Sequence, residues 1–384
     1  MLLHKDTILL SSIFLIPLLA ISIGNINIGG ANLQFFLAVT SMLIAIFYLI
    51  KWGEFKVNIF IIPLLFILFL TIPLFNSQFG VIQIIYVFIP FLYFMCGAYS
   101  SFDFNFNEKI KNKIKTTILL LLIFNFIALF GEYTQINSRP ASIFISLIAM
   151  IAIIVLDDLK DKMLIVLLFL FVLFSGARGA LIAGIIPLIF SYINKKISFK
   201  FSALLCFILA FGFFIFNEKV LSLIFSIDAL RERTFYDGIY NYEKILNLEF
   251  NSSGRDIAWP IYWEHIVERS KNIFSTVFGE GPGATSVIGV EKLGDRWAHP
   301  HNEFIRILID YGFLGLLSFL LFWSTIFYKV LKNKNKGITR LFISMLIFVI
   351  LIAMTDNPLM YPLYFGNLIL FLTGLSFSNR NIKY

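Results

Sequence analysis

Histidine, cysteine and charged residues are scarce in this chain. Charged residues make up 14% of its 384 residues, and there are only four histidines and two cysteines. The cysteines, Cys96 and Cys206, lie far apart in the sequence, so neither a disulfide framework nor a zinc site is indicated. Hydrophobic residues make up 59% of the chain and 46 residues are phenylalanine, which excludes an ordinary soluble domain.

Long apolar runs recur along the whole chain. An α-helix needs about 20 apolar residues to cross a bilayer, and many of these runs approach that length. They predict an all-α fold, a polytopic integral membrane helical bundle of about 12 transmembrane helices. The alternative is 11, because the seventh run is short and the last two are hard to separate. The predicted spans lie near residues 7–23, 32–50, 57–75, 81–99, 116–131, 140–156, 162–174, 179–193, 199–216, 303–328, 339–355 and 358–375.

The distribution of Lys and Arg predicts how the chain crosses the membrane. Most of the 31 basic residues fall in connections on one side. Outside one long loop, the connections on the other side hold only Arg139 and Arg178. By the positive-inside rule, the basic side is cytoplasmic and carries both termini, and the first apolar run is expected to be retained as a span. The net charge of +8 is then a topology signal, and no nucleic-acid partner is needed to explain it.

One connection is much longer than the others. Residues 217–302 form a polar segment on the outer side, before the tenth span, that is too long for a plain connector. It is expected to contain amphipathic helices near 227–247 and 256–271, followed by a glycine-rich turn at 279–283. No linker divides the chain, so residues 1–384 are predicted to form a single membrane domain, with this extracytoplasmic loop as a cap.

The end of this loop concentrates the rare ionisable residues. The loop ends with His299, His301 and Asn302, and the first turn of the tenth span adds Glu303 and Arg306. Ionisable residues at membrane depth are expensive and mark functional sites by default. The alternative is an interfacial turn whose polar side chains reach toward the headgroups. Asn302 stands where a helix N-cap is expected, so the sequence predicts a functional site at the start of this helix.

Arginines on the outer side form a second group. They are Arg139, Arg178, Arg255 and, one turn inside the tenth span, Arg306. A guanidinium fork binds phosphate oxygens and a helix N-terminus adds N–H donors, so several such groups around one cavity would suit a pyrophosphate. Taken alone, Arg139 also fits an interfacial anchor, and Arg306 also fits an ion pair with Glu303 or Asp310 along its helix. Trp259 fits either an interfacial belt or a platform for a sugar.

Four motifs, taken in order, resemble a known family. They are Ser175-Gly176-Ala177-Arg178-Gly179-Ala180, Ser253-Gly254-Arg255 followed by Trp259, the glycine-rich turn at 279–283, and His301-Asn302 followed by Tyr311-Gly312-Phe313-Leu314-Gly315. Their order, spacing and shared side of the membrane resemble the O-antigen polymerase and O-antigen ligase superfamily of bacterial membrane glycosyltransferases. Asp310 departs from the family pattern, where glutamate is more usual, but it keeps the charge.

The resemblance implies transfer of an undecaprenyl-pyrophosphate-linked oligosaccharide to a sugar acceptor, on the periplasmic side of the bacterial cytoplasmic (inner) membrane. The reaction would invert the anomeric centre and would need no nucleotide sugar, cofactor or obligatory metal. His301 would then be the base or would orient the acceptor, and Arg178 and Arg255 would stabilise the leaving pyrophosphate. The remaining positions would bind substrate or support the site: Arg139, Trp259, His299, Asn302, Glu303, Arg306 and Asp310.

The resemblance leaves three acceptors open: a second lipid-linked repeat unit, the lipid A core and a hydroxyl group of a protein. A polymerase would add the glycan to a second lipid-linked repeat unit, whereas a ligase would add it to the lipid A core. The run His-Asn-Glu-Phe-Ile-Arg from His301 slightly favours the polymerase, for which membrane lipids and a chain-length regulator are expected partners. The competing class is a transporter, such as a lipid-linked oligosaccharide flippase, which would predict two similar halves. The sequence shows no such halves, so the enzyme is preferred.

Overall fold

A computed structural model describes residues 2–23, 27–28, 31–52, 81–99, 108–128, 139–156, 159–174, 177–193, 255–294, 299–332, 336–357, 361–375 and 377. Within these residues the fold is helical apart from one antiparallel pair of short strands, β1 (Asn27–Ile28) and β2 (Ala31–Asn32). The helices are α1 (Leu2–Ile23), α2 (Leu33–Trp52), α4 (Val81–Tyr99), α5 (Glu108–Ala128), α6 (Arg139–Val155), α7 (Leu159–Phe174), α8 (Arg178–Ile193), α13 (Arg255–Arg269), α14 (Ile273–Phe278), α15 (Ala284–Leu293), α16 (Glu303–Lys332), α17 (Lys336–Thr355), the π-helical turn η5 (Pro362–Gly366) and α18 (Asn367–Leu375).

The helices follow the apolar runs of the sequence. Each predicted span within the described residues coincides with a helix, and the last one is divided into η5 and α18. The largest difference is at α5, which begins at Glu108 rather than near 116, because the Lys-rich stretch before the apolar run also favours a helix. The predicted spans near 57–75 and 199–216, and the loop helix near 227–247, lie outside the described residues. The loop helix predicted near 256–271 is confirmed as α13.

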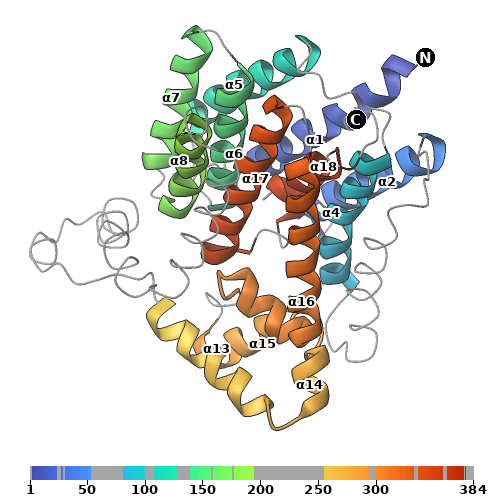
Figure 1. Cartoon of the computed structure of the whole chain (residues 1–384), viewed down its shortest axis with the longest axis vertical. Coiled ribbons are helices and arrows are strands. Elements are labelled where there is room, and N and C mark those ends of the chain that lie inside the picture. The colour runs from blue at the N-terminus through green and yellow to red at the C-terminus, as the bar shows by residue number, and fades with distance from the viewer. Residues whose placement is uncertain are drawn as a thin grey trace, which may run out of the picture.

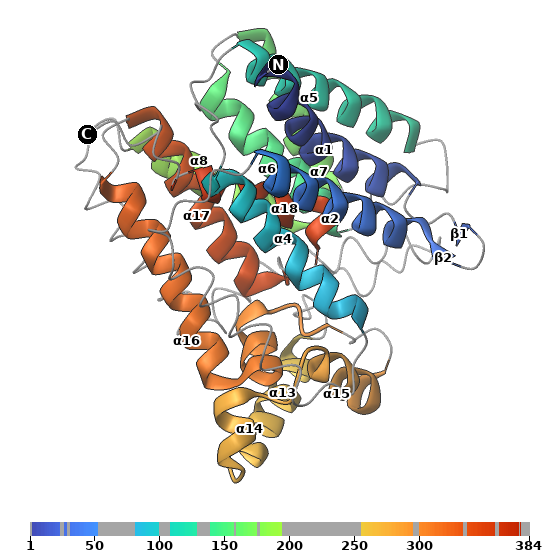
Figure 2. The same cartoon turned by 90° about the vertical axis from the view of Figure 1, so that its right-hand side faces the viewer.

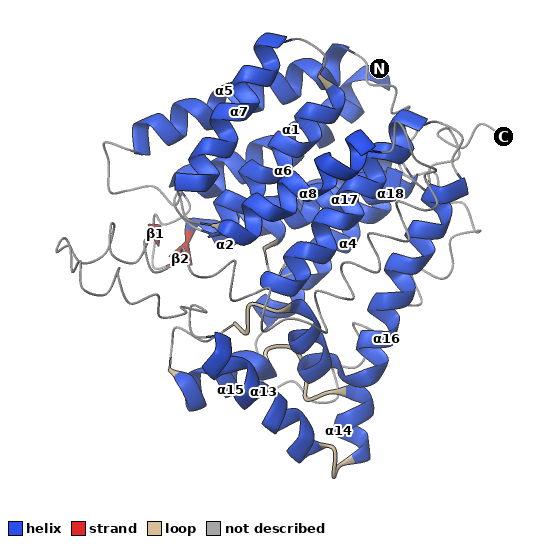
Figure 3. Cartoon of the chain, turned by 60° about the vertical axis from the view of Figure 1, so that its left-hand side comes forward, coloured by secondary structure: helices blue, strands red, loops and turns tan. Residues whose placement is uncertain are grey.

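The described helices form two parts (Figure 1). Most of the apolar helices pack into a bundle, and α13, α14 and α15 gather at one end of it as a cap. The long helix α16 starts beside the cap and runs along the bundle, so it belongs to both parts (Figure 2). Figure 3 shows the same division from another side, with α16 as the connecting element. Any site at the start of α16 therefore lies between the bundle and the cap.

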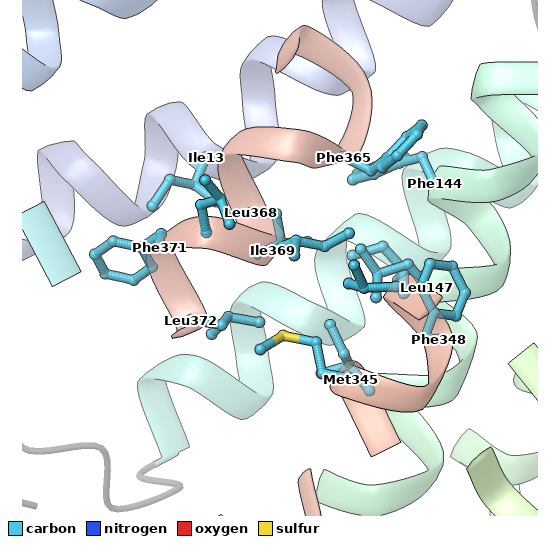
Figure 4. Close-up of a cluster of buried hydrophobic side chains, with 14 of the residues drawn as sticks. Ile13, Phe144, Leu147, Met345, Phe348, Phe365, Leu368, Ile369, Phe371 and Leu372 are labelled. Atoms are coloured by element: carbon cyan, nitrogen blue, oxygen red, sulfur yellow. The ribbon is translucent and has the colours of Figure 1, made fainter. Parts of the chain in front are cut away.

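The short helix α18 lies in the middle of the bundle and organises its core. All of its side chains from Asn367 to Leu375 are buried, which explains an apolar run with no polar face. Figure 4 shows Leu368, Ile369, Phe371 and Leu372 among buried side chains of other helices, including Ile13, Phe144, Leu147, Met345 and Phe348. This core holds α1, α6 and α17 around α18 and fixes the bundle against which α16 packs.

Two glycines allow α4 and α18 to pack backbone against backbone. A Cβ atom added to Gly97 of α4 would fall on the carbonyl oxygen of Phe371. One added to Gly374 of α18 would fall on the carbonyl oxygen of Phe94. Small residues at such a crossing are typical of helices packed within membranes.

The outer surface of the bundle is also apolar. Large exposed apolar side chains occur on α2, α7 and α16, for example Leu43, Met163 and Leu321. Two described helical segments, Leu33–Lys51 and Glu303–Leu331, are long and apolar enough to cross a membrane, and the other apolar helices are shorter. Apolar helices with apolar outer faces are consistent with a membrane protein, while the count of twelve spans remains a prediction.

The α4–α18 contact generates a test of the fold. Replacing Gly374 by Val should lower the thermal unfolding midpoint of the detergent-solubilised protein, because the new side chain would push the two backbones apart. Overpacking of a well-packed core costs about 1–3 kcal/mol, and a backbone clash should reach the upper end. The matched control is Leu43→Phe, which enlarges an exposed side chain on α2 and should leave the midpoint unchanged. Equal midpoints for both variants would argue against the close contact.

Candidate functional site

The start of α16 is fixed by the residue just before it. The side-chain Oδ1 of Asn302 accepts hydrogen bonds from the backbone N–H groups of Phe304 at 3.0 Å and Ile305 at 3.2 Å. A helix leaves its first N–H groups without intrahelical partners, so Asn302 is the N-cap of α16. The predicted capping role of Asn302 is therefore confirmed. Asn302 is buried, so the cap ties the end of the loop to the helix away from solvent.

His301, next to this cap, pairs with an acidic residue from another helix. Its ring Nδ1 lies 3.3 Å from Oδ1 of Asp356, the residue that follows α17. Asp356 is buried, and its Oδ1 also accepts a hydrogen bond from the backbone N–H of Asn357 at 2.9 Å. The backbone of His301 has a φ of 49°, a left-handed conformation that non-glycine residues seldom adopt and that occurs often at functional sites. The turn brings the imidazole to the end of α17.

His299 has a different electrostatic setting. Burial, followed by the nearby His301, lowers the pKa of His299 to about 4; Asp356 opposes this shift and Arg306 adds to it. The imidazole of His299 is therefore neutral at pH 7. The pKa is about 6.5 in an unfolded chain, so neutral His299 contributes stability that is complete above about pH 6.5 and is lost as the pH falls toward 4.

In the first turns of α16, a buried arginine lies between two carboxylates. Arg306 donates through Nε (3.1 Å) and Nη2 to Oε1 of Glu303, and its Nη1 lies 3.4 Å from Oδ2 of Asp310. The three residues are at most 1% exposed. The alternative interpretation of Arg306 as an ion pair along its helix is confirmed. Removing one partner of such a buried group leaves an uncompensated charge, so the three side chains depend on one another.

Asp310 connects this ion cluster to the cap. Its Oδ1 accepts hydrogen bonds from the backbone N–H of Thr285 at 3.0 Å and from the Thr285 hydroxyl at 2.9 Å. Thr285 is the second residue of α15, where N–H groups lack intrahelical acceptors and the helix dipole favours a negative charge. The side chain of Asp310 thus joins the start of α15 to α16, and Tyr311 adds a ring whose centroid lies 5.8 Å from the Arg306 guanidinium carbon.

The helix α16 is broken at Gly312, where φ is 68° and ψ is −168°. The break removes the intrahelical donors that carbonyls about four residues earlier would otherwise use. The predicted glycine-rich turn supplies two replacements. The N–H of Glu280 donates to the carbonyl of Ile309 at 3.0 Å, and the N–H of Gly281 donates to that of Asp310 at 2.9 Å. The two glycine-containing motifs of the sequence are therefore hydrogen-bonded partners.

Arg269, at the end of α13, supplies further hydrogen-bond donors to the backbone carbonyls that the break in α16 leaves open. Its Nη1 donates to the carbonyl of Ile309 at 2.8 Å and its Nη2 donates to that of Leu308. The Arg269 side chain is buried, and burial lowers its pKa while the charge of Glu280 acts in the opposite direction. Oε1 of Glu280 also lies 2.9 Å from Nε2 of His265. These contacts hold the C-terminal end of α13 on the break in α16.

The other end of α13 lies beside the candidate site. Nε1 of Trp259 donates to the carbonyl of Pro300 at 2.9 Å, directly before His301. Trp259 also packs against a small cap core that includes Tyr262. The indole is thus a structural contact to the loop end. Arg255 is the first residue of α13 and precedes Trp259 by about one helical turn, which places its backbone in the same region.

Three of the predicted arginines begin helices. Arg139, Arg178 and Arg255 are the first residues of α6, α8 and α13, where the positive end of the helix dipole lies. The start of α8 reaches the site, because a Cβ added to Gly179 would lie 2.9 Å from Oγ1 of Thr355, the residue before Asp356. The start of α6 lies at the same end of the bundle, since α6, α7 and α8 follow one another through short connections. This position in the fold places the start of α6 at the same end of the bundle as His301.

Some buried polar atoms at the site have no partner within the described part of the chain. They are Oε2 of Glu303 and both amide atoms of Asn357. Buried polar groups are almost always hydrogen-bonded, so such atoms call for a ligand or ordered water. Asn357 follows Asp356, whose charge acts on Glu303. The unpartnered atoms therefore belong to the same polar region as His301.

Sequence reasoning missed Asp356, Asn357, Thr285 and Arg269. Asp356 and Asn357 carried a usable signal, since they are polar residues between two apolar runs on the predicted outer side. Thr285 and Arg269 carried none, because their roles depend on where α15 and α13 pack. No group of three or more His, Cys, Asp or Glu that could hold a metal ion occurs among the described residues.

The buried cluster generates a stability prediction. Replacing Arg306 by Met should destabilise the protein by about 3–5 kcal/mol, because it leaves Glu303 and Asp310 charged and buried without their partner. Thermal unfolding in detergent measures the effect, and Arg306→Lys should fall between this variant and the parent protein. Lys292→Met, at an exposed position of α15, is the control and should leave the midpoint in place. If Arg306→Met unfolded at the same temperature as the parent protein, the three side chains would not depend on one another.

A family model matches part of the chain. Residues 163–320 match the family model described as O-antigen ligase, whereas no curated protein matches the chain. The matched stretch includes Arg178, Arg255, Trp259 and His301, while Arg139 and Asp356 lie outside it. The match supports an O-antigen ligase or polymerase type of function, enzyme activity in general and a place in the bacterial inner membrane. Residues 163–320 of this chain are thus similar to the O-antigen ligase family, and this similarity supports the resemblance of the sequence motifs to the O-antigen ligase and polymerase superfamily.

Proposed function

We propose that the protein transfers a glycan from an undecaprenyl-pyrophosphate donor to a sugar hydroxyl at the outer face of the inner membrane, with inversion and without a metal ion. The observation that carries the proposal is the pairing of His301 with Asp356 at the capped start of α16. An imidazole oriented by a buried carboxylate is a common form of general base. Glycosyl transfer to a hydroxyl needs such a base.

The reaction follows from this pair. If Nδ1 of His301 donates its proton to Asp356, the lone pair of the neutral ring is on Nε2, which accepts the proton of the acceptor hydroxyl. The hydroxyl oxygen then bonds to the anomeric carbon of the donor sugar as the bond from that carbon to the pyrophosphate oxygen breaks. The electron pair leaves with undecaprenyl pyrophosphate. Attack opposite the leaving group inverts the anomeric centre.

The leaving pyrophosphate needs positive charge close to the donor. Arg178 and Arg255 are assigned to it because the helices that they begin reach the region of Asp356 and Pro300. The N–H groups of these helix starts add to the same electrostatic stabilisation. Arg139, at the same end of the bundle, is a further binding residue. Arg306 has a supporting role, since its guanidinium is already held by Glu303 and Asp310.

The acceptor is assigned to the polar atoms beside His301. The unpartnered oxygen of Glu303 and the amide of Asn357 can bind sugar hydroxyl groups. His299 stays neutral at pH 7 because burial lowers its pKa to about 4, so it can accept or donate a hydrogen bond without adding charge. Asn302 and Trp259 support the site by holding the start of α16 and the end of the loop.

The acceptor identity distinguishes two forms of the proposal. The slightly favoured form is a surface polysaccharide polymerase, which extends a second lipid-linked repeat unit and works with a chain-length regulator. The second form is a ligase that uses the lipid A core, and the description of the matching family as O-antigen ligase favours it. Both forms place the site at the periplasmic face, both termini in the cytoplasm and membrane lipids around the bundle.

One assay tests the proposal and separates the two forms. Purified protein is mixed with lipid-linked repeat units in the presence of a chelator, first alone and then with lipid A core. A ladder of lengthened lipid-linked glycan from the donor alone identifies a polymerase, and product only with the core identifies a ligase. No transfer in either mixture, together with flipping of the donor in proteoliposomes, would contradict an enzyme and favour a transporter.

The proposed base generates a prediction on activity. His301→Ala should lower the rate of transfer by about 10²- to 10⁴-fold, the usual contribution of general acid–base catalysis. Asp356→Asn should also lower it, because an amide no longer favours the ring form with its lone pair on Nε2. Transfer by the parent protein should fall on acidification, since a protonated imidazole cannot accept the hydroxyl proton.

Controls separate these effects from misfolding. His265→Gln alters a histidine that pairs with Glu280 on the cap, away from His301, and should retain parent-like transfer. The pKa of His299 is about 4, so this residue stays neutral between pH 5 and 7. A loss of transfer activity in that pH range is therefore not caused by protonation of His299. Parent-like rates for a folded His301→Ala variant would exclude His301 as the base.

The arginines generate a second prediction on activity. Arg178→Gln should reduce transfer by about 10²- to 10³-fold, the usual effect of removing one donor to developing negative charge. Arg178→Lys should restore only part of the rate, because a point charge does not reproduce the two-pronged contact of a guanidinium with phosphate oxygens. Arg255→Gln and Arg255→Lys should have the same effects as the corresponding substitutions at Arg178. Arg340→Gln, at the predicted cytoplasmic end of α17, is the control and should transfer normally.

A further inference from the structure

The cap exposes a corner of large apolar side chains. Trp263 and Val267 of α13 are 43% and 66% exposed, and Ile273 and Phe274 of α14 are 78% and 53% exposed. These four residues, here termed the cap corner, lie on either side of the turn that joins the two helices. Exposed large apolar side chains gathered at one corner mark a site of contact with a protein or a membrane.

The cap corner lies where the exposed apolar stripe of α16 begins. This stripe consists of Phe313, Leu317, Leu320 and Leu321, whose spacing places them on one face of the helix. A Cβ added to Gly312 would meet the carbonyl of Val277, so α14 packs directly against the break that precedes the stripe. Phe274 precedes Val277 by about one turn of α14. Figures 1 and 3 show α14 at the cap end of α16.

The length of α16 sets the depth of this corner. The helix ends at Lys332, which lies at the polar boundary on the predicted cytoplasmic side. About 20 helical residues cross the hydrocarbon core of a bilayer. Counting 20 residues back from Lys332 reaches Phe313, the first residue after the break. The outer edge of the hydrocarbon therefore falls at the break, and α14 lies at the level of the headgroups.

We propose that the cap corner is a membrane-binding surface that inserts into the outer boundary of the periplasmic leaflet. Trp263 suits the headgroup level, and Ile273 and Phe274 reach the start of the acyl chains. Lys271 is exposed in the turn between the two helices and can meet lipid phosphates. The occupant is lipid because α14, which carries half of the cap corner, packs directly against the break at which the stripe of α16 begins. This contact is independent of the proposed transfer reaction, and it keeps the start of α13 at the depth of a lipid-linked pyrophosphate.

Depth-resolved fluorescence quenching tests the proposal. An Ile273→Cys variant, in a chain with Cys206 replaced by Ser, is labelled with bimane and reconstituted into phosphatidylcholine–phosphatidylglycerol vesicles. Lipids that carry a nitroxide near the top of the acyl chain should quench this label more strongly than lipids with a deep nitroxide or than aqueous iodide. Val267→Cys provides a second position on the same corner, should the first variant fold poorly.

Two labelled positions calibrate the result. Glu291→Cys, exposed on α15 of the same cap, should be quenched by iodide, and Leu321→Cys, on the stripe of α16, by the deep nitroxide. Strong quenching of the Ile273 label by iodide would overturn the proposal, because the corner would then face water. Protection from both iodide and lipid nitroxides would also overturn it, since a protein surface would then cover the corner. None of these outcomes depends on glycosyl transfer.

Discussion

The break of α16 at Gly312 is the constraint on which the rest of the site depends. An unbroken helix would use the carbonyls of Ile309 and Asp310 for its own hydrogen bonds, whereas the break makes them available to the glycine-rich turn and to Arg269. The cap is therefore held on the bundle by directional backbone contacts as well as by packing. Because α13 also reaches the carbonyl of Pro300 through Trp259, the break and the loop end are fixed by the same helix.

The charges near the start of α16 form two neighbouring groups in an apolar setting, and the charge of Asp356 in one group acts on Glu303 in the other. His301 meets Asp356, Arg306 lies between Glu303 and Asp310, and Asp310 caps the start of α15. Low local polarity strengthens each contact and raises the cost of leaving any member without a partner. The atoms that do lack described partners, on Glu303 and Asn357, lie in the region proposed for the acceptor. The same polar region thus holds the protein scaffold together and contains the proposed acceptor site.

Much of the fold could be predicted from the sequence, because apolar runs and helix signals are local properties. Asn302 before an apolar run predicted its cap, and the apolar runs predicted α4, α8 and α17 closely. The short helices α14 and α15 escaped prediction, since helices of this length depend largely on tertiary contacts, even with the Asn272 N-cap that begins α14. The same holds for the site. His301 stood out by composition, but its partner Asp356 directly follows another helix, and the packing of α17 brings the two together.

The most direct test of the account is to map where the donor binds. An undecaprenyl-pyrophosphate glycan with a photoreactive diazirine on the sugar next to the pyrophosphate is crosslinked to the protein in membranes, and the labelled peptides are identified by mass spectrometry. The account predicts labels at the starts of α8 and α13 and around His301, with protection by excess unlabelled donor. Labels that fall instead within the helices around α18, such as α1 and α4, would contradict it and would indicate a path through the bundle.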